Sequence, residues 1–140
     1  MQQAYTSLLK RAHEKNIFVS FDPNYRHLLF KNNTPSFIEQ SWHFLQHCNF
    51  FKLSDEEAML LTNTNTLMDA AEKLVQQTSA LFTITLGKDG TLLGYQKNIS
   101  ILPSIPVKPV DTTGAGDAFV GAVLYQLSFK TTDEIKKLPV

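Results

Sequence analysis

Two kinds of hydrophobic pattern alternate along the chain between residues 1 and 90. Apolar side chains spaced three or four apart predict helices at 5–15, from 34 to about 47, after residue 54 and at 67–77. Runs of β-branched and aromatic residues predict buried strands at 17–21, 49–53 and 81–86. Because these strands alternate with helices, we expect them to be parallel and joined by helical crossovers. Helices should then cover both faces of the sheet, which makes the fold class α/β.

The pattern changes after residue 86. Lys88-Asp89-Gly90 predicts a hairpin turn, with a returning strand at 91–95 and a further extended stretch at 99–102. A proline-rich loop follows. Apolar residues at helical spacing then predict a helix that begins near Gly116 and runs to Leu127, with a short helix near residue 132. We expect the longer helix to pack tightly against another part of the protein.

The polar residues at the predicted helix starts match capping patterns. Ser54 and Glu57 have the spacing of a capping box, Thr66 can cap the helix that follows it, and Thr34 can cap a helix whose first residue is Pro35. These positions have a structural explanation that does not require any chemistry.

Composition narrows the function classes. The chain has 140 residues, 43% hydrophobic and 19% charged, with 13 basic and 13 acidic side chains, so its formal net charge is zero. That balance disfavours a nucleic-acid partner, and no apolar run approaches the roughly 18 residues of a membrane span. Residues 1–5 lack the pattern of a signal peptide, so the expected location is the cytoplasm. The one cysteine, Cys48, falls in an apolar helical pattern and is expected to be a buried core thiol.

The segment Asp111-Thr112-Thr113-Gly114-Ala115-Gly116-Asp117 carries the most chemical information. It feeds a turn of small residues into the start of a helix, where amides of Gly114, Ala115 and Gly116 are expected to point outward and bind an anion. Asp117 would lie beside that anion and could accept a proton from an attacking hydroxyl. These are the requirements for phosphoryl transfer to an alcohol, although helix capping and tight packing explain the same residues.

This segment resembles the C-terminal signature of the ribokinase-like (PfkB) carbohydrate kinases. Phe21-Asp22-Pro23-Asn24-Tyr25-Arg26 is similar to the form found in fructokinases and 2-keto-3-deoxygluconate kinases. The segments 52–57 and 84–90 occur in the family's order and spacing, so the resemblance runs from about residue 1 to the end. It implies a three-layer α/β/α fold with a mostly parallel sheet, and ATP, Mg²⁺, K⁺ and a small-molecule sugar as ligands and partners.

The resemblance also implies roles for individual residues. Asp117 would be the general base at the sugar hydroxyl, and the three small residues before it would form the anion hole. The expected binding residues are, for the nucleotide, Thr85, Gly87, Ser54 and Glu57; for the sugar or phosphates, Asn24 and Arg26; for Mg²⁺ through water, Glu57; and for the monovalent cation, Asp111 and Thr113. Ser54 stands where the family's motif usually has asparagine. Ordinary turns, strand ends and caps would explain the same positions.

Members of that family are normally more than twice this long. We therefore interpret residues 1–140 as the nucleotide-binding and catalytic, C-terminal part of one kinase domain, with the N-terminal half and the small lid absent. Without neighbouring strands, the chain is expected to be marginally stable, to self-associate or to need the missing half as a partner.

The expected function is ATP-dependent phosphorylation of a sugar hydroxyl, with fructokinase as the first choice. A 2-keto-3-deoxygluconate kinase and a non-catalytic remnant that binds nucleotide or a partner chain remain as alternatives. A dinucleotide-binding site is disfavoured because Phe119 stands where its third glycine would be, and no P-loop sequence is present.

Overall fold

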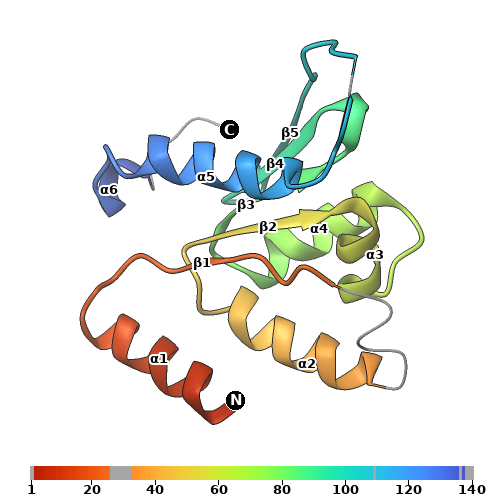
Figure 1. Cartoon of the computed structure of the whole chain (residues 1–140). Helices are drawn as coiled ribbons and strands as arrows, with labels where there is room; N and C mark the ends of the chain where they lie inside the picture. Colours follow the sequence, from red (N-terminus) through yellow and green to blue (C-terminus); the bar gives the residue numbers. More distant parts are fainter. Residues whose placement is uncertain (1, 26–32, 109, 136, 138–140) are drawn as a thin grey trace.

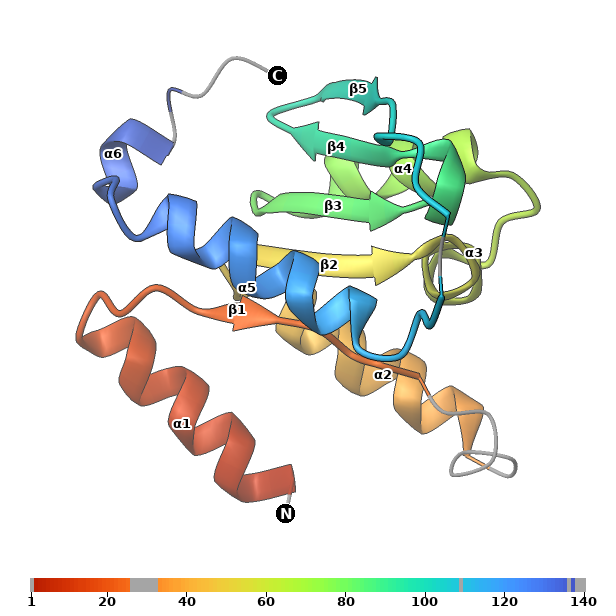
Figure 2. The same cartoon turned by 45° about the horizontal axis from the view of Figure 1, so that its top comes forward.

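The computed structural model describes residues 2–25, 33–108, 110–135 and 137. Its strands form one sheet in the order β1-β2-β3-β4-β5. Strands β1 to β3 are parallel, and β3 to β5 are antiparallel (Figure 2). The strand bounds are β1 Ser20–Phe21, β2 Phe50–Ser54, β3 Leu81–Thr85, β4 Thr91–Tyr95 and β5 Asn98–Leu102. The sheet is thus mixed, with the expected parallel crossovers in its first half and the expected hairpin in its second.

Helices cover both faces of this sheet. Helices α2, α3 and α4 lie on one side and α5 on the other, while α1 lies beyond β1 and next to α2 (Figure 1). The helix bounds are α1 Gln2–Glu14, α2 Thr34–Leu45, α3 Asp55–Thr62, α4 Leu67–Gln77, α5 Ala115–Leu127 and α6 Thr132–Ile135, with a 3₁₀ turn η1 at Gly87–Asp89. The predicted α/β class with helices on both faces is confirmed.

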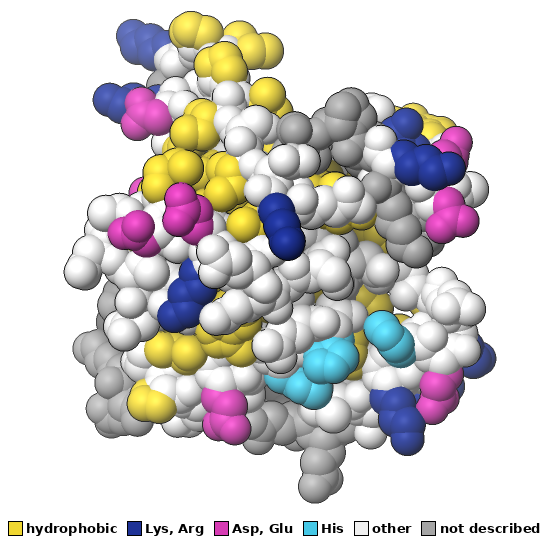
Figure 3. Space-filling view, turned by 180° about the vertical axis from the view of Figure 1, so that it is seen from behind, with side chains coloured by type: hydrophobic (Ala, Val, Ile, Leu, Met, Phe, Trp, Pro, Cys, Tyr) yellow, Lys and Arg dark blue, Asp and Glu magenta, His cyan; other side chains and the backbone are white. Residues whose placement is uncertain are grey.

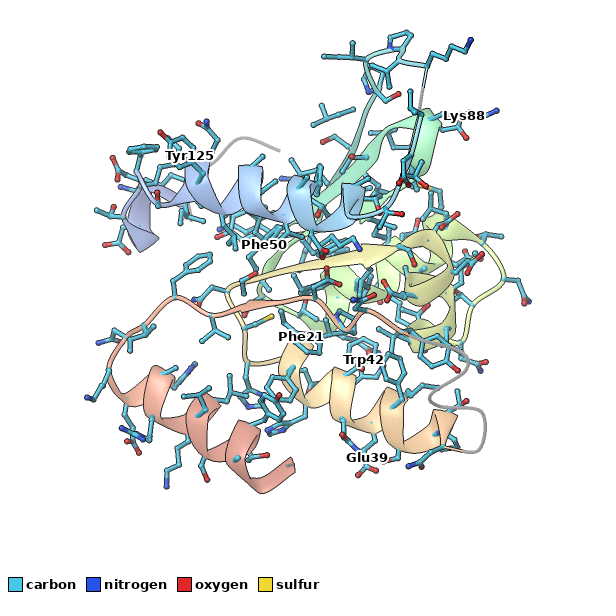
Figure 4. All side chains as sticks on the ribbon, viewed as in Figure 1. Phe21, Glu39, Trp42, Phe50, Lys88 and Tyr125 are labelled. Carbon is cyan, nitrogen blue, oxygen red and sulfur yellow. The ribbon has the colours of Figure 1, made fainter. Side chains whose placement is uncertain are left out.

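Side chains of successive strand residues point to opposite faces of the sheet, so the core is divided into two apolar clusters. Phe51 and Phe82 point towards α2, α3 and α4, where their rings stack 4.9 Å apart. Phe50, labelled in Figure 4, points the opposite way and packs with Leu127 of α5. A Cβ at Gly94 would overlap the ring of Phe82, so only glycine allows this packing. Side chains on the two faces of β2 therefore pack against helices on opposite sides of the sheet.

Two element boundaries differ from the sequence prediction for identifiable reasons. The first strand begins at Ser20 because the amide of Val19 donates to the side-chain Oδ1 of Asn49, at 2.8 Å, and not to a strand backbone. Asn33, and not Thr34, occupies the N-cap of α2, without a side-chain cap bond. The Thr34 hydroxyl instead lies 3.3 Å from the hydroxyl of Tyr25.

The prediction that α5 packs tightly is correct only for its C-terminal half. Leu127 is buried, and Val123 packs partly against the same cluster. Ala118 and Ala122 are exposed, and so is Tyr125, labelled in Figure 4. No described element covers this outer face of α5.

Exposed aliphatic side chains also gather on the projecting end of the molecule formed by β5 and the loop that follows it (Figure 3). Those in the loop are Ile105, Val107 and Val110. Cys48 is buried as expected, and burial raises its pKa to about 12. Among the described helices, none is long and apolar enough to cross a membrane.

Candidate active site

The carboxyl ends of the three parallel strands meet at one edge of the sheet, where ligands bind in open α/β folds. Asp22 and Asn24 follow β1, Ser54 ends β2, and Thr85 ends β3 as the direct register partner of Ser54. Gly87 lies just beyond, exposed and with a left-handed φ of 59°. The strand topology thus gathers most of the predicted nucleotide and sugar residues at this edge.

The N-terminus of α5 reaches the same edge from the opposite face of the sheet (Figure 2). A Cβ placed on Gly116 would lie 3.4 Å from the Nζ atom of Lys52, which projects from β2. Asp117 is the next residue in the first turn of α5, and it is exposed. The predicted base is therefore accessible, and the residue before it lies close to Lys52 of β2.

The turn before α5 is held by its own polar groups. The Oδ1 atom of Asp111 accepts from the amide of Thr113 at 2.8 Å. Hydrogen bonds from the Thr113 backbone and side chain lower the pKa of Asp111 below its usual value. Gly114 then adopts a left-handed φ of 75°, which favours glycine. Asp111 and Thr113, the expected cation-binding residues, are both exposed and hydrogen-bond to each other within this turn.

The donors of the turn differ in part from the expected anion hole. The amide of Ala115 donates to the carbonyl of Thr112 at 3.1 Å, so that donor is engaged within the turn. The first helical hydrogen bond runs from Ala118 to Gly114. Among the described residues, the amides of Gly114, Gly116 and Asp117 have no acceptor. A group of backbone donors therefore remains at the positive end of α5, but the amide of Asp117 takes the place of the Ala115 amide in it.

Glu57 links two segments of this edge. Its Oε2 atom accepts from the amide of Ser54 at 2.7 Å, and its own amide donates to the Ser54 hydroxyl, which confirms the predicted capping box. Its Oε1 atom accepts from the amide of Tyr25 at 2.6 Å. Glu57 is only 6% exposed, so this carboxylate ties the loop after β1 to the start of α3. Its expected part in holding Mg²⁺ stays a prediction.

An ion pair between Lys52 and Asp22 was not singled out from the sequence. Lys52 Nζ lies 3.6 Å from Asp22 Oδ2, and their side chains are 12% and 22% exposed. Burial raises the pKa of Asp22, an effect that the positive charge of Lys52 partly offsets and that Glu57 reinforces. The signal available in the sequence was a lysine inside the otherwise apolar strand Phe50-Phe51-Lys52-Leu53.

The remaining predicted site residues make mainly local or strand-to-strand contacts. Asn24 is exposed with a left-handed φ of 46°, and its amide donates to Asp22 Oδ1 at 3.3 Å. The hydroxyl of Thr85 donates to the carbonyl of Leu53 at 3.3 Å, so it is engaged between strands. Arg26 lies outside the described residues. No group of three or more metal-ligating side chains is found in the part of the chain that the structure describes.

Comparison with known proteins places this geometry in a family. Fructokinase from Vibrio alginolyticus is 31% identical over 122 residues, which cover 86% of this chain and 39% of that protein. The crystal structure of aminoimidazole riboside kinase from Salmonella enterica matches with a TM-score of 0.78 and 34% identity, over 87% of this chain and 41% of that one.

A fructokinase double mutant from Vibrio cholerae, solved with fructose, ADP and a potassium ion, matches with a TM-score of 0.83 and 30% identity. The match covers 92% of this chain and 41% of the Vibrio cholerae protein. The chain thus spans about two fifths of the length of the relatives that it matches. The family model for pfkB family carbohydrate kinases matches residues 1–134. The chain therefore belongs to the pfkB family of carbohydrate kinases.

Proposed function

We propose that this chain carries the nucleotide-binding and catalytic part of an ATP-dependent sugar kinase. The observation that carries the proposal is the first turn of α5, where an exposed carboxylate, Asp117, lies beside backbone amides that have no acceptor among the described residues. Family membership and similar structures solved with ADP or ATP support a phosphorylated nucleotide as the ligand.

In the proposed reaction, the hydroxyl oxygen of the sugar attacks the γ-phosphorus of ATP as the bond to the bridging oxygen breaks, and ADP leaves. Asp117 accepts the proton of the hydroxyl. The free amides of Gly114 and Gly116, at the positive end of α5, stabilise the negative charge on the transferred phosphoryl group. Mg²⁺, when bound, would neutralise charge between the phosphates, with Glu57 acting through water.

Fructose is the proposed acceptor because several of the similar proteins are named fructokinases. The likeness to aminoimidazole riboside kinase makes a ribosyl compound the second choice, ahead of 2-keto-3-deoxygluconate. K⁺ is proposed as the monovalent cation, near Asp111 and Thr113, because the fructokinase neighbour holds a potassium ion.

A complete site is proposed to need further strands beside β1. Strand β1 pairs with β2 alone among the described strands, which leaves its other edge open. An apolar groove of about 800 Å³ lies between α1 and this edge, and its lining includes Leu8, Ile17 and Phe18. The Vibrio alginolyticus fructokinase and the aminoimidazole riboside kinase are more than twice as long as this chain, so we propose that a strand from the remainder of the kinase fills the groove.

A coupled assay with MgATP and fructose tests this function. The chain is assayed alone and together with the part of Vibrio alginolyticus fructokinase that it does not match, and MgATP binding is measured by calorimetry in parallel. Asp117→Asn should abolish turnover while leaving ATP binding within about threefold. Glu72→Gln, an exposed carboxylate on α4, is the matched control.

The outcomes separate the alternatives. Absence of MgATP binding by the unmodified chain overturns the proposal. Binding without turnover in both assays favours the non-catalytic alternative. Turnover that survives Asp117→Asn shows that another group is the base.

A further inference from the structure

The proposed phosphoryl site has a side-chain cation, Lys52, to which the sequence motifs assigned no role. Lys52 projects from the middle of β2 on the α5 side of the sheet, because Phe50, two residues earlier, packs into the α5-side cluster. Its ammonium lies beneath the first turn of α5, 3.4 Å from the position of a Cβ on Gly116.

This ammonium is largely buried and incompletely paired. Its side chain is only 12% exposed, and the described residues provide it with one ionic partner, Asp22, at 3.6 Å. That separation exceeds the roughly 2.7–2.9 Å of a strong charge-assisted hydrogen bond. A lysine ammonium has three donor hydrogens, so it can hold Asp22 and still donate to a second anion.

A polar group beside Lys52 lacks a hydrogen-bond partner among the described residues. Thr83 on β3 is the register partner of Lys52, and it faces α5 because Leu81, two residues earlier, does so. Its hydroxyl is buried, with Thr83 only 4% exposed, and has no hydrogen-bond partner among the described residues. Buried hydroxyls are rarely left unpaired, which points to a ligand or water oxygen at this level of the sheet.

We propose that Lys52 is a phosphoryl-binding residue that bridges Asp22 and an oxygen of the terminal phosphate of ATP. The inference rests on the proposed kinase function and adds a positively charged side chain to its phosphoryl site. The backbone donors of α5 would bind the phosphate from one side, and Lys52 would bind it from the strand beneath Gly116. Asp22 acts as a positioning residue, since it holds the ammonium at the edge of the sheet.

Binding of MgATP and MgADP to the full chain separates this role from a merely structural one. A cation directed at the γ-phosphate should matter for ATP and little for ADP. We expect Lys52→Met to weaken MgATP binding by about ten- to a hundredfold, the effect of removing a hydrogen bond to a charged group. MgADP binding should change by less than about threefold, and Lys52→Arg should restore most of the ATP affinity. Lys10→Met, an exposed lysine on α1, is the control.

Circular dichroism melts accompany each variant. If Lys52→Met does not fold, the pair Asp22→Asn with Lys52→Met, which removes both charges, replaces it. The inference is overturned if a folded variant binds MgATP as the control does, or if it loses ATP and ADP affinity equally. If the unmodified chain binds neither nucleotide, the proposed kinase function fails first and this role falls with it.

Discussion

The buried carboxylate of Glu57 offers a direct test of how the candidate site is assembled. It accepts two backbone hydrogen bonds, from Tyr25 at 2.6 Å and Ser54 at 2.7 Å, and is only 6% exposed. Glutamine at this position keeps one accepting oxygen but replaces the other with an amide group that can only donate. Glu57→Gln therefore leaves one of the two backbone amides facing another donor.

The expected loss of stability follows from these contacts. A buried donor without an acceptor costs about 1–3 kcal/mol. Loss of a negative charge at the N-terminus of α3 adds about 0.3–1 kcal/mol. We therefore expect Glu57→Gln to lower the free energy of unfolding by about 1–4 kcal/mol. The neighbouring Glu56 is exposed, so Glu56→Gln should lose only the smaller charge effect of about 0.3–1 kcal/mol.

Urea unfolding monitored by circular dichroism, without nucleotide or Mg²⁺, measures the difference between the two variants. In a thermal melt of the same two variants, a difference of about 2 kcal/mol in a domain of this size corresponds to a difference of roughly 6 °C in Tm. Equal stabilities of Glu57→Gln and Glu56→Gln would refute the view that this carboxylate ties β1 to α3. A difference that appears only in the presence of Mg²⁺ would instead assign Glu57 a role limited to the metal.

Two further predictions concern the contacts around Lys52. Gly116→Ala should keep its stability or gain up to about 1 kcal/mol, because the added Cβ makes an ordinary 3.4 Å contact with Lys52. The same Cβ should cover the free amides and so weaken MgATP binding in calorimetry. Gly121→Ala, which adds a Cβ in open space on the same helix, should melt at a similar temperature but leave MgATP binding unchanged. Lys52→Met should raise the pKa of Asp22 further above its ordinary value in an NMR titration, because the lysine charge lowers it. An unchanged pKa would contradict the ion pair. Since the folded pKa of Asp22 is raised, its protonation contributes stability at low pH that is lost as pH rises through the folded pKa.

Local signals predicted the secondary structure well. The capping box at Ser54 and the cap at Thr66 formed as expected because both depend on residues within one helical turn. The first strand and the cap of α2 were predicted less accurately. Both were decided by distant groups, the side chain of Asn49 and the hydroxyl of Tyr25, which no pattern within a short window could reveal.

In the candidate site too, the sequence revealed local features but not contacts between distant residues. Motif spacing predicted that Asp117 and the glycines lie together at the start of one helix, because that placement depends on a single turn, and their catalytic role stays a prediction. It could not show that the Ala115 amide turns back to Thr112, since that depends on the exact dihedral angles of the turn. The approach of Lys52 to Gly116 was also hidden, because it joins positions 64 residues apart that meet only when α5 crosses β2.

The attachment of α5 determines how precisely Asp117 can be placed. The C-terminal half of the helix is anchored by Leu127 in the α5-side cluster, whereas the first turn, which carries the carboxylate, rests near Lys52 and has an uncovered outer face. A displacement of about 1 Å is enough to reduce catalysis a hundredfold. Covering the outer face of α5 would fix its first turn more firmly, whereas pairing the open edge of β1 would hold Asp22 and hence Lys52. Partners at these two surfaces would therefore act on the same proposed phosphoryl site by different routes, one through α5 and the other through the end of β1.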